Sequence, residues 1–114
     1  MIIKTKYDIG HTFWVPRCVE EYSTEEMNFE GETWNRNVVN YVGYAKQKRI
    51  MKVVASTYAG TKVHIQYYVL NTDQDEHSSM SQVYSEGEIN DYTEQQALEI
   101  ALDFQAKKEE YYGN

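Results

Sequence analysis

The residue types best suited to catalysis stand near the start of the chain. Asp8 and His11 flank Gly10, and the only cysteine, Cys18, follows a few residues later. A carboxylate can orient an imidazole as a general base, and a thiol can then act as the nucleophile. Apart from Arg17, however, nothing in the sequence around Cys18 would activate its thiol. We therefore favour the interpretation that Asp8 and Gly10 shape a turn before a strand, with His11 exposed to solvent.

Patterns that bind metals and phosphates are also missing. The three histidines, His11, His64 and His77, never have the spacing that places two ligands on one face of a helix. A cysteine-based metal site would lack ligands, because the chain has one cysteine. The six glycines do not form a phosphate-binding loop. The sequence therefore predicts a non-enzymatic protein without catalytic residues, metal or cofactor.

Length and composition fit one folded domain over residues 1–114, since 41% of the residues are hydrophobic and 25% are charged. No apolar stretch approaches the roughly 20 residues that a membrane helix needs, and the first residues do not lead into a signal-peptide core. A single cysteine fits a reducing compartment. We expect a cytoplasmic protein that does not contact membranes.

Most of the chain has the residue types of short β-strands. Pro16 indicates that the first strand ends there or lies at a sheet edge. In residues 62–69, Val63, Ile65, Tyr67 and Val69 alternate with other residues, which predicts that they share a core-facing side. The basic residues at 46–49 are expected in a turn, and Gly60 in another. The predicted strands are residues 12–15, 38–44, 50–58, 62–69 and 80–84.

The end of the chain predicts a helix over residues 93–110. Thr93 and Gln96 have the spacing of a capping box, and Gly113 is a stop signal. Ser85 and Glu88 have the same spacing but predict only a single turn. The apolar stripe of the helix consists of Ala97, Ile100, Ala101 and Phe104, widened by Leu98 and Leu102.

Short strands followed by one helix predict a mainly β fold. A small SH3-like barrel with the C-terminal helix over one opening is the first choice, because closure removes exposed sheet edges. The alternative is an α+β fold in which an open antiparallel sheet carries the helix on one face.

Several of these motifs occur in the order found in a known group of proteins. Residues 7–10 (YDIG) lead into a Phe-Trp-Val strand, residues 63–69 read Val-x-Ile-x-Tyr-x-Val, and residues 85–89 (SEGEI) precede a Glu-rich helix. The chain thereby resembles small phage and prophage proteins of SH3-like build. The resemblance implies a barrel and a phage or mobile-element origin, and it transfers no catalytic residues to this chain. Small acidic phage proteins are often inhibitors of host machinery, anti-CRISPR proteins among them.

The acidic segment 19–37 departs from that pattern, and we interpret it as a loop inserted between strands. It lacks the spacing of a calcium loop. It could be solvated, could pack down on the fold through its aromatic residues, or could bind a protein with a basic surface, since charge steers encounter and aromatics enrich interfaces. The predicted contact residues are Glu20, Glu21, Tyr22, Glu25, Glu26, Phe29, Glu30, Glu32 and Trp34.

A basic segment offers an alternative function. Lys46, Lys48, Arg49 and Lys52 lie close to several tyrosines, as in small barrels that bind nucleic acid. The formal net charge of −7 argues against this alternative, because it repels phosphate. The sequence therefore favours an acidic protein that binds and inhibits a nucleic-acid-handling or defence protein of a host.

Overall fold

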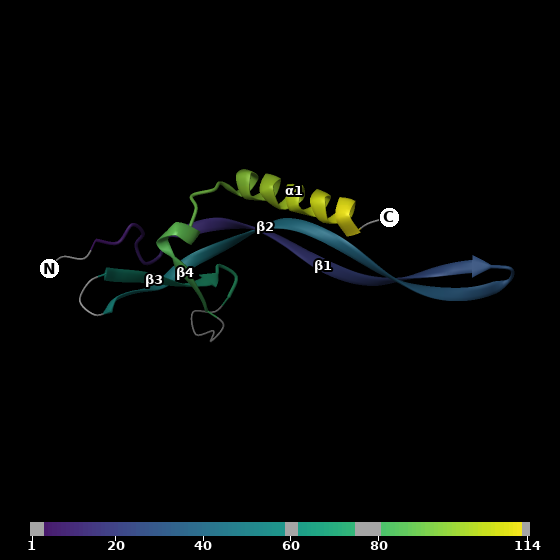
Figure 1. Cartoon of the computed structure of the whole chain (residues 1–114), viewed down its shortest axis with the longest axis horizontal. Coiled ribbons are helices and arrows are strands. Elements are labelled where there is room, and N and C mark those ends of the chain that lie inside the picture. Colours follow the sequence, from purple (N-terminus) through teal and green to yellow (C-terminus); the bar gives the residue numbers. More distant parts are fainter. Residues whose placement is uncertain (1–3, 59–61, 75–80, 113–114) are drawn as a thin grey trace.

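The computed structural model describes residues 4–58, 62–74 and 81–112. Sequence predictions at Gly60, His77, Met80 and Gly113 lie outside the described residues. The elements are β1 (Thr12–Phe29), β2 (Glu32–Tyr58), β3 (Lys62–Asn71), β4 (Gln82–Ser85), a short 3-10 turn η1 (Glu86–Glu88) and α1 (Glu94–Tyr112), as Figure 1 shows.

The four strands form one antiparallel sheet in the order β1-β2-β3-β4. Within the described residues β1 and β4 do not pair, so the sheet is open and the predicted SH3-like barrel is wrong. The alternative, an open antiparallel sheet with a helix on one face, is confirmed. The physical reason is strand length: β1 and β2 run far beyond the other strands as one hairpin, and short strands that bend at each end are what a small barrel needs.

The predicted turn at residues 46–49 is wrong, because the chain continues through it as part of β2. Neighbouring groups hold the segment extended: the Lys46 ammonium pairs with Asp73 at 2.6 Å, and the Thr72 N–H donates to the Gln47 carbonyl at 3.1 Å. A register shift between Ile50 and Lys52 marks a β-bulge opposite β3. The extra residue changes which later side chains of β2 face the core.

The core lies on one face of the four-stranded part of the sheet. Tyr67 and Val69 of β3 are completely buried beside Ile50 of β2, so the predicted core face of β3 is confirmed there, although Val63 near the strand start is 41% exposed. The N-terminal segment covers this face through Tyr7, whose ring meets Tyr67 edge-on with 5.7 Å between centroids. Phe13 and Ile89 complete the buried cluster.

Helix α1 lies on the opposite face. Side chains alternate between the two faces of a strand, and Ile50 of β2 faces the core. Gly43 lies seven residues earlier, so its position faces away from the core, towards α1. A Cβ at Gly43 would lie 2.4 Å from the Ala101 carbonyl oxygen, so only glycine allows this close approach. Ala97 and Ala101 are buried, whereas Leu102 and Phe104 of the predicted stripe remain nearly half exposed.

The predicted capping box of the helix is confirmed. The Gln96 N–H donates to Thr93 Oγ1 at 3.1 Å, and the Thr93 N–H donates to Gln96 Oε1 at 2.9 Å. The helix starts at the next residue, Glu94. The expected single turn after Ser85 is η1, where the Ser85 N–H donates to Glu88 Oε1.

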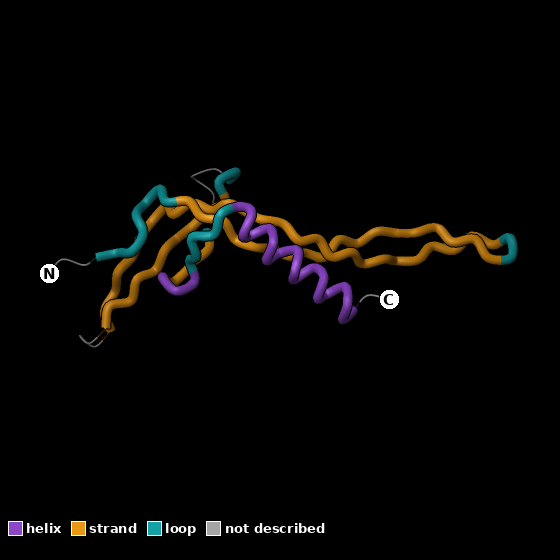
Figure 2. Tube along the Cα trace, turned by 90° about the horizontal axis from the view of Figure 1, so that it is seen from above, coloured by secondary structure: helices purple, strands orange, loops and turns teal. Residues whose placement is uncertain are grey.

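The β1–β2 hairpin extends past the end of α1, whose Tyr112 ring lies 6.1 Å from that of Tyr41. We call residues 20–41 the arm and the remaining described residues the body. The molecule measures 77 × 30 × 29 Å, and its radius of gyration of 20.4 Å exceeds the roughly 13 Å of a compact chain of this length (Figures 1 and 2). The prediction that residues 19–37 form a loop is wrong, because they are paired strands around a two-residue turn. Glu30 (φ 51°) and Gly31 (φ 81°) both have the positive φ of a type I′ turn.

Candidate functional site

The three candidate catalytic residues do not meet. The His11 N–H donates to the Asp8 carbonyl at 3.1 Å and Gly10 has a φ of 95°, so the predicted turn is confirmed. The His11 ring is partly buried rather than exposed, with Nε2 3.2 Å from Asp91 Oδ1. Cys18 lies six residues along β1 from Thr12, about 20 Å away at the rise of a strand.

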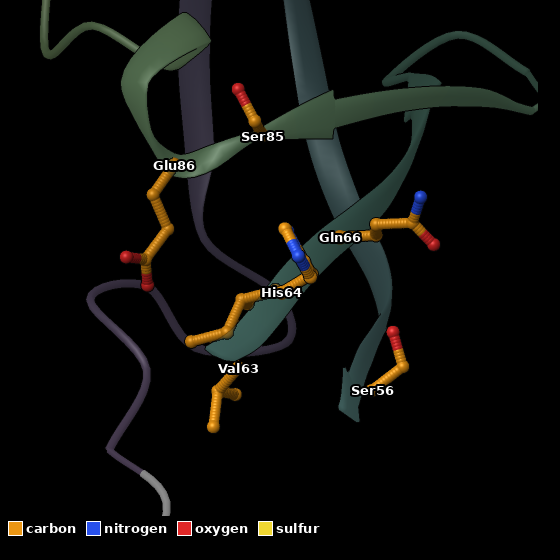
Figure 3. A pocket seen from close by; sticks show the side chains of 7 residues that line it. Ser56, Val63, His64, Gln66, Ser85 and Glu86 are labelled. Atoms are coloured by element: carbon orange, nitrogen blue, oxygen red, sulfur yellow. The ribbon is translucent and has the colours of Figure 1, made fainter. Parts of the chain in front are cut away.

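A pocket of about 400 Å³ beside β3 is lined by Ser56, His64 and Glu86 among others. Figure 3 shows Ser56 and Glu86 on opposite sides of this pocket. Glu86 accepts hydrogen bonds from the Tyr67 hydroxyl at 2.6 Å and from the Lys6 N–H at 2.9 Å, and the Tyr67 bond holds the pKa of its carboxyl below the ordinary value. Glu86 therefore anchors the N-terminal segment to the body.

Residues 4–58, 62–74 and 81–112 contain no cluster of three or more histidine, cysteine or acidic side chains that could hold a metal. In the same residues no helix combines the length and the apolar character that crossing a membrane requires.

The four residues of the basic segment do not form one surface. Lys46 and Lys48 alternate with other residues on the core face of β2. Arg49 is paired with Leu70 and Lys52 with Tyr68, and these pairs lie on the opposite face. Lys46 is paired with Asp73, and the Lys52 ammonium lies 5.5 Å from the centre of the Tyr68 ring. This arrangement gives a nucleic-acid backbone no continuous row of cations to follow.

Lys48 is the one charged or polar residue among the buried residues of the described chain, with 4% of its surface exposed. Its ammonium donates to Asn71 Oδ1 at 2.8 Å and to Gln82 Oε1 at 2.6 Å. Burial, followed by the nearby cations Arg17 and Lys46, lowers the pKa of Lys48. Lys48 is therefore a structural group that joins β2, β3 and the start of β4.

All nine predicted contact residues lie on the arm, and all are exposed. The register places them on two faces, because directly paired residues share a face. The first face carries Glu21, Glu25, Phe29, Glu32 and Trp34, and it also carries Met27 and Arg36. The second face carries Glu20, Tyr22 and Glu26, while Glu30 is in the turn.

The first face has an apolar cluster at its end. Met27 is paired directly with Trp34, and Phe29 is diagonal to Trp34, being paired with Glu32. Phe29 is 69% exposed, Trp34 60% and Met27 45%. We call these three residues the tip cluster. Met27 was absent from the predicted contact residues, and only the pairing register reveals its place.

Charge surrounds the tip cluster. Six glutamates and one arginine fall within residues 19–37, so this segment carries a formal charge of −5 out of the −7 of the whole chain. Arg36 pairs with Glu25 at 2.9 Å. On the second face the Tyr22 hydroxyl donates to Glu20 Oε2 at 2.6 Å, and this carboxylate raises the pKa of Tyr22.

Comparison of the chain with known protein families, with curated proteins and with solved structures finds no match. The phage or mobile-element origin therefore stays a prediction, whereas the SH3-like build is contradicted by the open sheet. The candidate site rests on the geometry of the arm.

Proposed function

We propose that this is a non-enzymatic binding protein whose arm contacts a partner protein with a basic surface. The observation that carries the proposal is the tip cluster, which stays exposed at the end of a two-stranded ribbon. A ribbon of two strands buries too little apolar surface to be stable alone. Exposed aromatic residues and Met gathered in one place are typical of a contact surface.

The charge of the arm supports a partner with a basic surface. A local charge of −5 attracts cationic surfaces and repels anionic ones, which raises the rate of encounter with a basic partner. Proteins that handle nucleic acids bind the phosphate backbone in basic grooves, which present such a cationic surface. Occupation of such a groove by the arm would exclude nucleic acid, so the effect on the partner is inhibition. The target that we propose is a host nucleic-acid-handling or defence protein, as expected for a chain of phage or mobile-element origin.

Photo-crosslinking from single positions tests this proposal. A photoreactive residue replaces Phe29 in the tip cluster, and in a matched control it replaces Val63, an exposed apolar residue of the body. We expect a specific crosslink to a basic protein from position 29 and none from position 63. Equal crosslinking from both positions would contradict contact through the arm.

The electrostatic part is tested with the purified partner. Affinity is expected to fall with added salt, since exposed charges are screened. It should also fall when Glu25, Glu26, Glu30 and Glu32 are replaced together by Gln. An affinity that is insensitive both to salt and to this replacement would remove charge from the proposal.

A further inference from the structure

A groove of about 640 Å³ lies between β2 and the C-terminal end of α1. One wall is made by six consecutive residues of β2, 36–41, and the other by Glu109 and Tyr112 of α1. Figure 1 shows the C-terminal end of α1 beside the hairpin at the start of the arm. Consecutive lining residues mean that the backbone of β2 itself forms this wall.

The hydrogen bonds next to the groove show which backbone groups face it. The Gly43 N–H donates to Gln105 Oε1 at 2.8 Å, so it points away from β1. Backbone direction repeats every second residue in a strand, and in an antiparallel strand the N–H and C=O of one residue point to the same side. Asn37, Val39 and Tyr41 therefore direct both groups into the groove.

Two independent features confirm this parity. The Gln47 carbonyl, four residues beyond Gly43, accepts from the Thr72 N–H and so also points away from β1. Pro16, which has no N–H to donate, is paired with Ala45 and thus occupies a position whose nitrogen faces away from β2.

In the described chain β3 pairs with β2 only from Lys48 onward, so no strand covers residues 36–41. Unpaired edge groups are a template for an additional strand. Gln105 already provides one such partner at Gly43, with its side chain in place of a strand.

We propose that this groove binds an extended basic peptide segment of a partner protein, which adds as a strand to the edge of β2. The proposal deepens the proposed function by naming how a partner segment is held. Each of Asn37, Val39 and Tyr41 can exchange two backbone hydrogen bonds with the added strand. The side chains of that strand alternate between the α1 side and solvent.

Charge decides between a foreign peptide and a second copy of this chain. Glu109 lies in the wall and Glu20 is paired with Tyr41, while Arg36 is offset by its bond to Glu25 and the Lys108 ammonium lies 5.7 Å from the centre of the Tyr41 ring. A second copy carries a net charge of −7 and is repelled, whereas a basic peptide is attracted. The Tyr41 and Tyr112 rings, 6.1 Å apart, offer an apolar base for an alternate side chain.

Amide hydrogen exchange with a defined probe tests the site on the full chain. The probe is an eight-residue peptide that alternates lysine and valine, with blocked ends, and its control alternates glutamate and valine. We expect the lysine peptide to slow exchange at the Asn37, Val39 and Tyr41 amides and to leave Tyr22 and Thr24, on the opposite edge, unchanged. The glutamate peptide should slow none of them.

A matched pair of proline variants then isolates the edge. Asn37 and Thr24 are directly paired, and both N–H groups point outward, so Asn37→Pro and Thr24→Pro each remove one outward donor and spare the β1–β2 ladder. We expect Asn37→Pro to weaken peptide binding about tenfold, through the lost donor and the bulk of the ring. Thr24→Pro and Asn37→Ala should bind as the unchanged chain does.

Several results would overturn the proposal: equal weakening by both prolines, protection along β1, equal binding of both peptides, or protection that appears with protein concentration alone. The last of these would assign the groove to a second copy. Absence of any protection, with the crosslink from position 29 intact, overturns the groove and leaves the proposed function standing. Protection at the groove without that crosslink contradicts the tip as the contact and leaves the groove standing.

Discussion

The two halves of the β1–β2 hairpin have the same backbone structure and opposite surroundings. In the body, the N-terminal segment covers one face and α1 covers the other, so Tyr67 and Ile50 are completely buried. The end of α1 reaches the arm only at its start, near Tyr41, and towards the tip Trp34 and Phe29 are mostly exposed. Stability in this chain therefore comes from the elements that pack on the hairpin. The uncovered half is left free for contact with a partner.

Truncation of one large aromatic residue in each half should give the largest difference between body and arm. Tyr67→Ala leaves a cavity in the core and should cost about 3–5 kcal/mol of unfolding free energy. Trp34→Ala in the arm should change it by no more than about 0.5 kcal/mol, since the side chain is exposed. Denaturant unfolding of the two variants measures both values. Similar losses would mean that the arm belongs to the same cooperative unit as the core.

The second prediction concerns the boundary between body and arm. A methyl group at Gly43 meets the Ala101 carbonyl at 2.4 Å, so Gly43→Ala must displace α1 and should cost about 1–3 kcal/mol, in the range of overpacking. Gly87→Ala is the matched control, because nothing lies within 4 Å of the added atom. Thermal unfolding of both variants provides the comparison. Equal stability would show that α1 does not rest on this part of β2.

The turn at the end of the arm allows a local test. Glu30 adopts a positive φ, which is energetically less favourable for Glu than for Asn. Glu30→Asn should therefore stabilise the tip by about 0.5–1 kcal/mol. Gly31→Ala should destabilise the tip by about 1–2 kcal/mol. Hydrogen exchange at the Met27 and Trp34 amides reports both changes. We expect the free energy of unfolding of the body to stay the same. A parallel change in it would show that body and arm unfold as one cooperative unit.

The smallest expected effect is a pH dependence specific to the body. Because the pKa of Lys48 is lowered by burial, the folded protein binds this proton less tightly than the unfolded chain does. As the pH rises from the lowered pKa of Lys48 in the folded protein to its pKa of about 10.4 in the unfolded chain, the free energy of unfolding therefore increases. The stability of the wild type relative to Lys48→Met should increase over this range. A constant difference would mean that Lys48 is well solvated.

Local signals in the sequence predicted local structure correctly. Thr93 and Gln96 predicted the helix start because capping depends only on residues three apart. The alternation around Tyr67 and Val69 predicted the buried side of β3, and Asp8 with Gly10 predicted the turn.

The arm was not predictable in the same way. Glutamate is poor in intrinsic strand preference, and Glu30-Gly31 is not one of the usual type I′ pairs, so residues 19–37 have the composition of a loop. The barrel was predicted wrongly for the same reason. Closure depends on strand length, and the loop-like composition of residues 19–37 made the first two strands look short. The glutamates and aromatics were predicted as contact residues from their types, and they are exposed, but their division into two faces depends on a register that only the paired structure shows.

Shortening the arm tests the division between body and arm most directly. Deleting residues 22–27 together with their partners 34–39 removes six paired rungs, an even number that keeps every remaining side chain on its own face. Equilibrium unfolding in denaturant should give a free energy within about 1 kcal/mol of the full chain, because every removed residue except the half-buried Val38 is exposed. Loss of cooperative unfolding, or a drop of several kcal/mol, would contradict the claim that the arm is held for contact and not for stability.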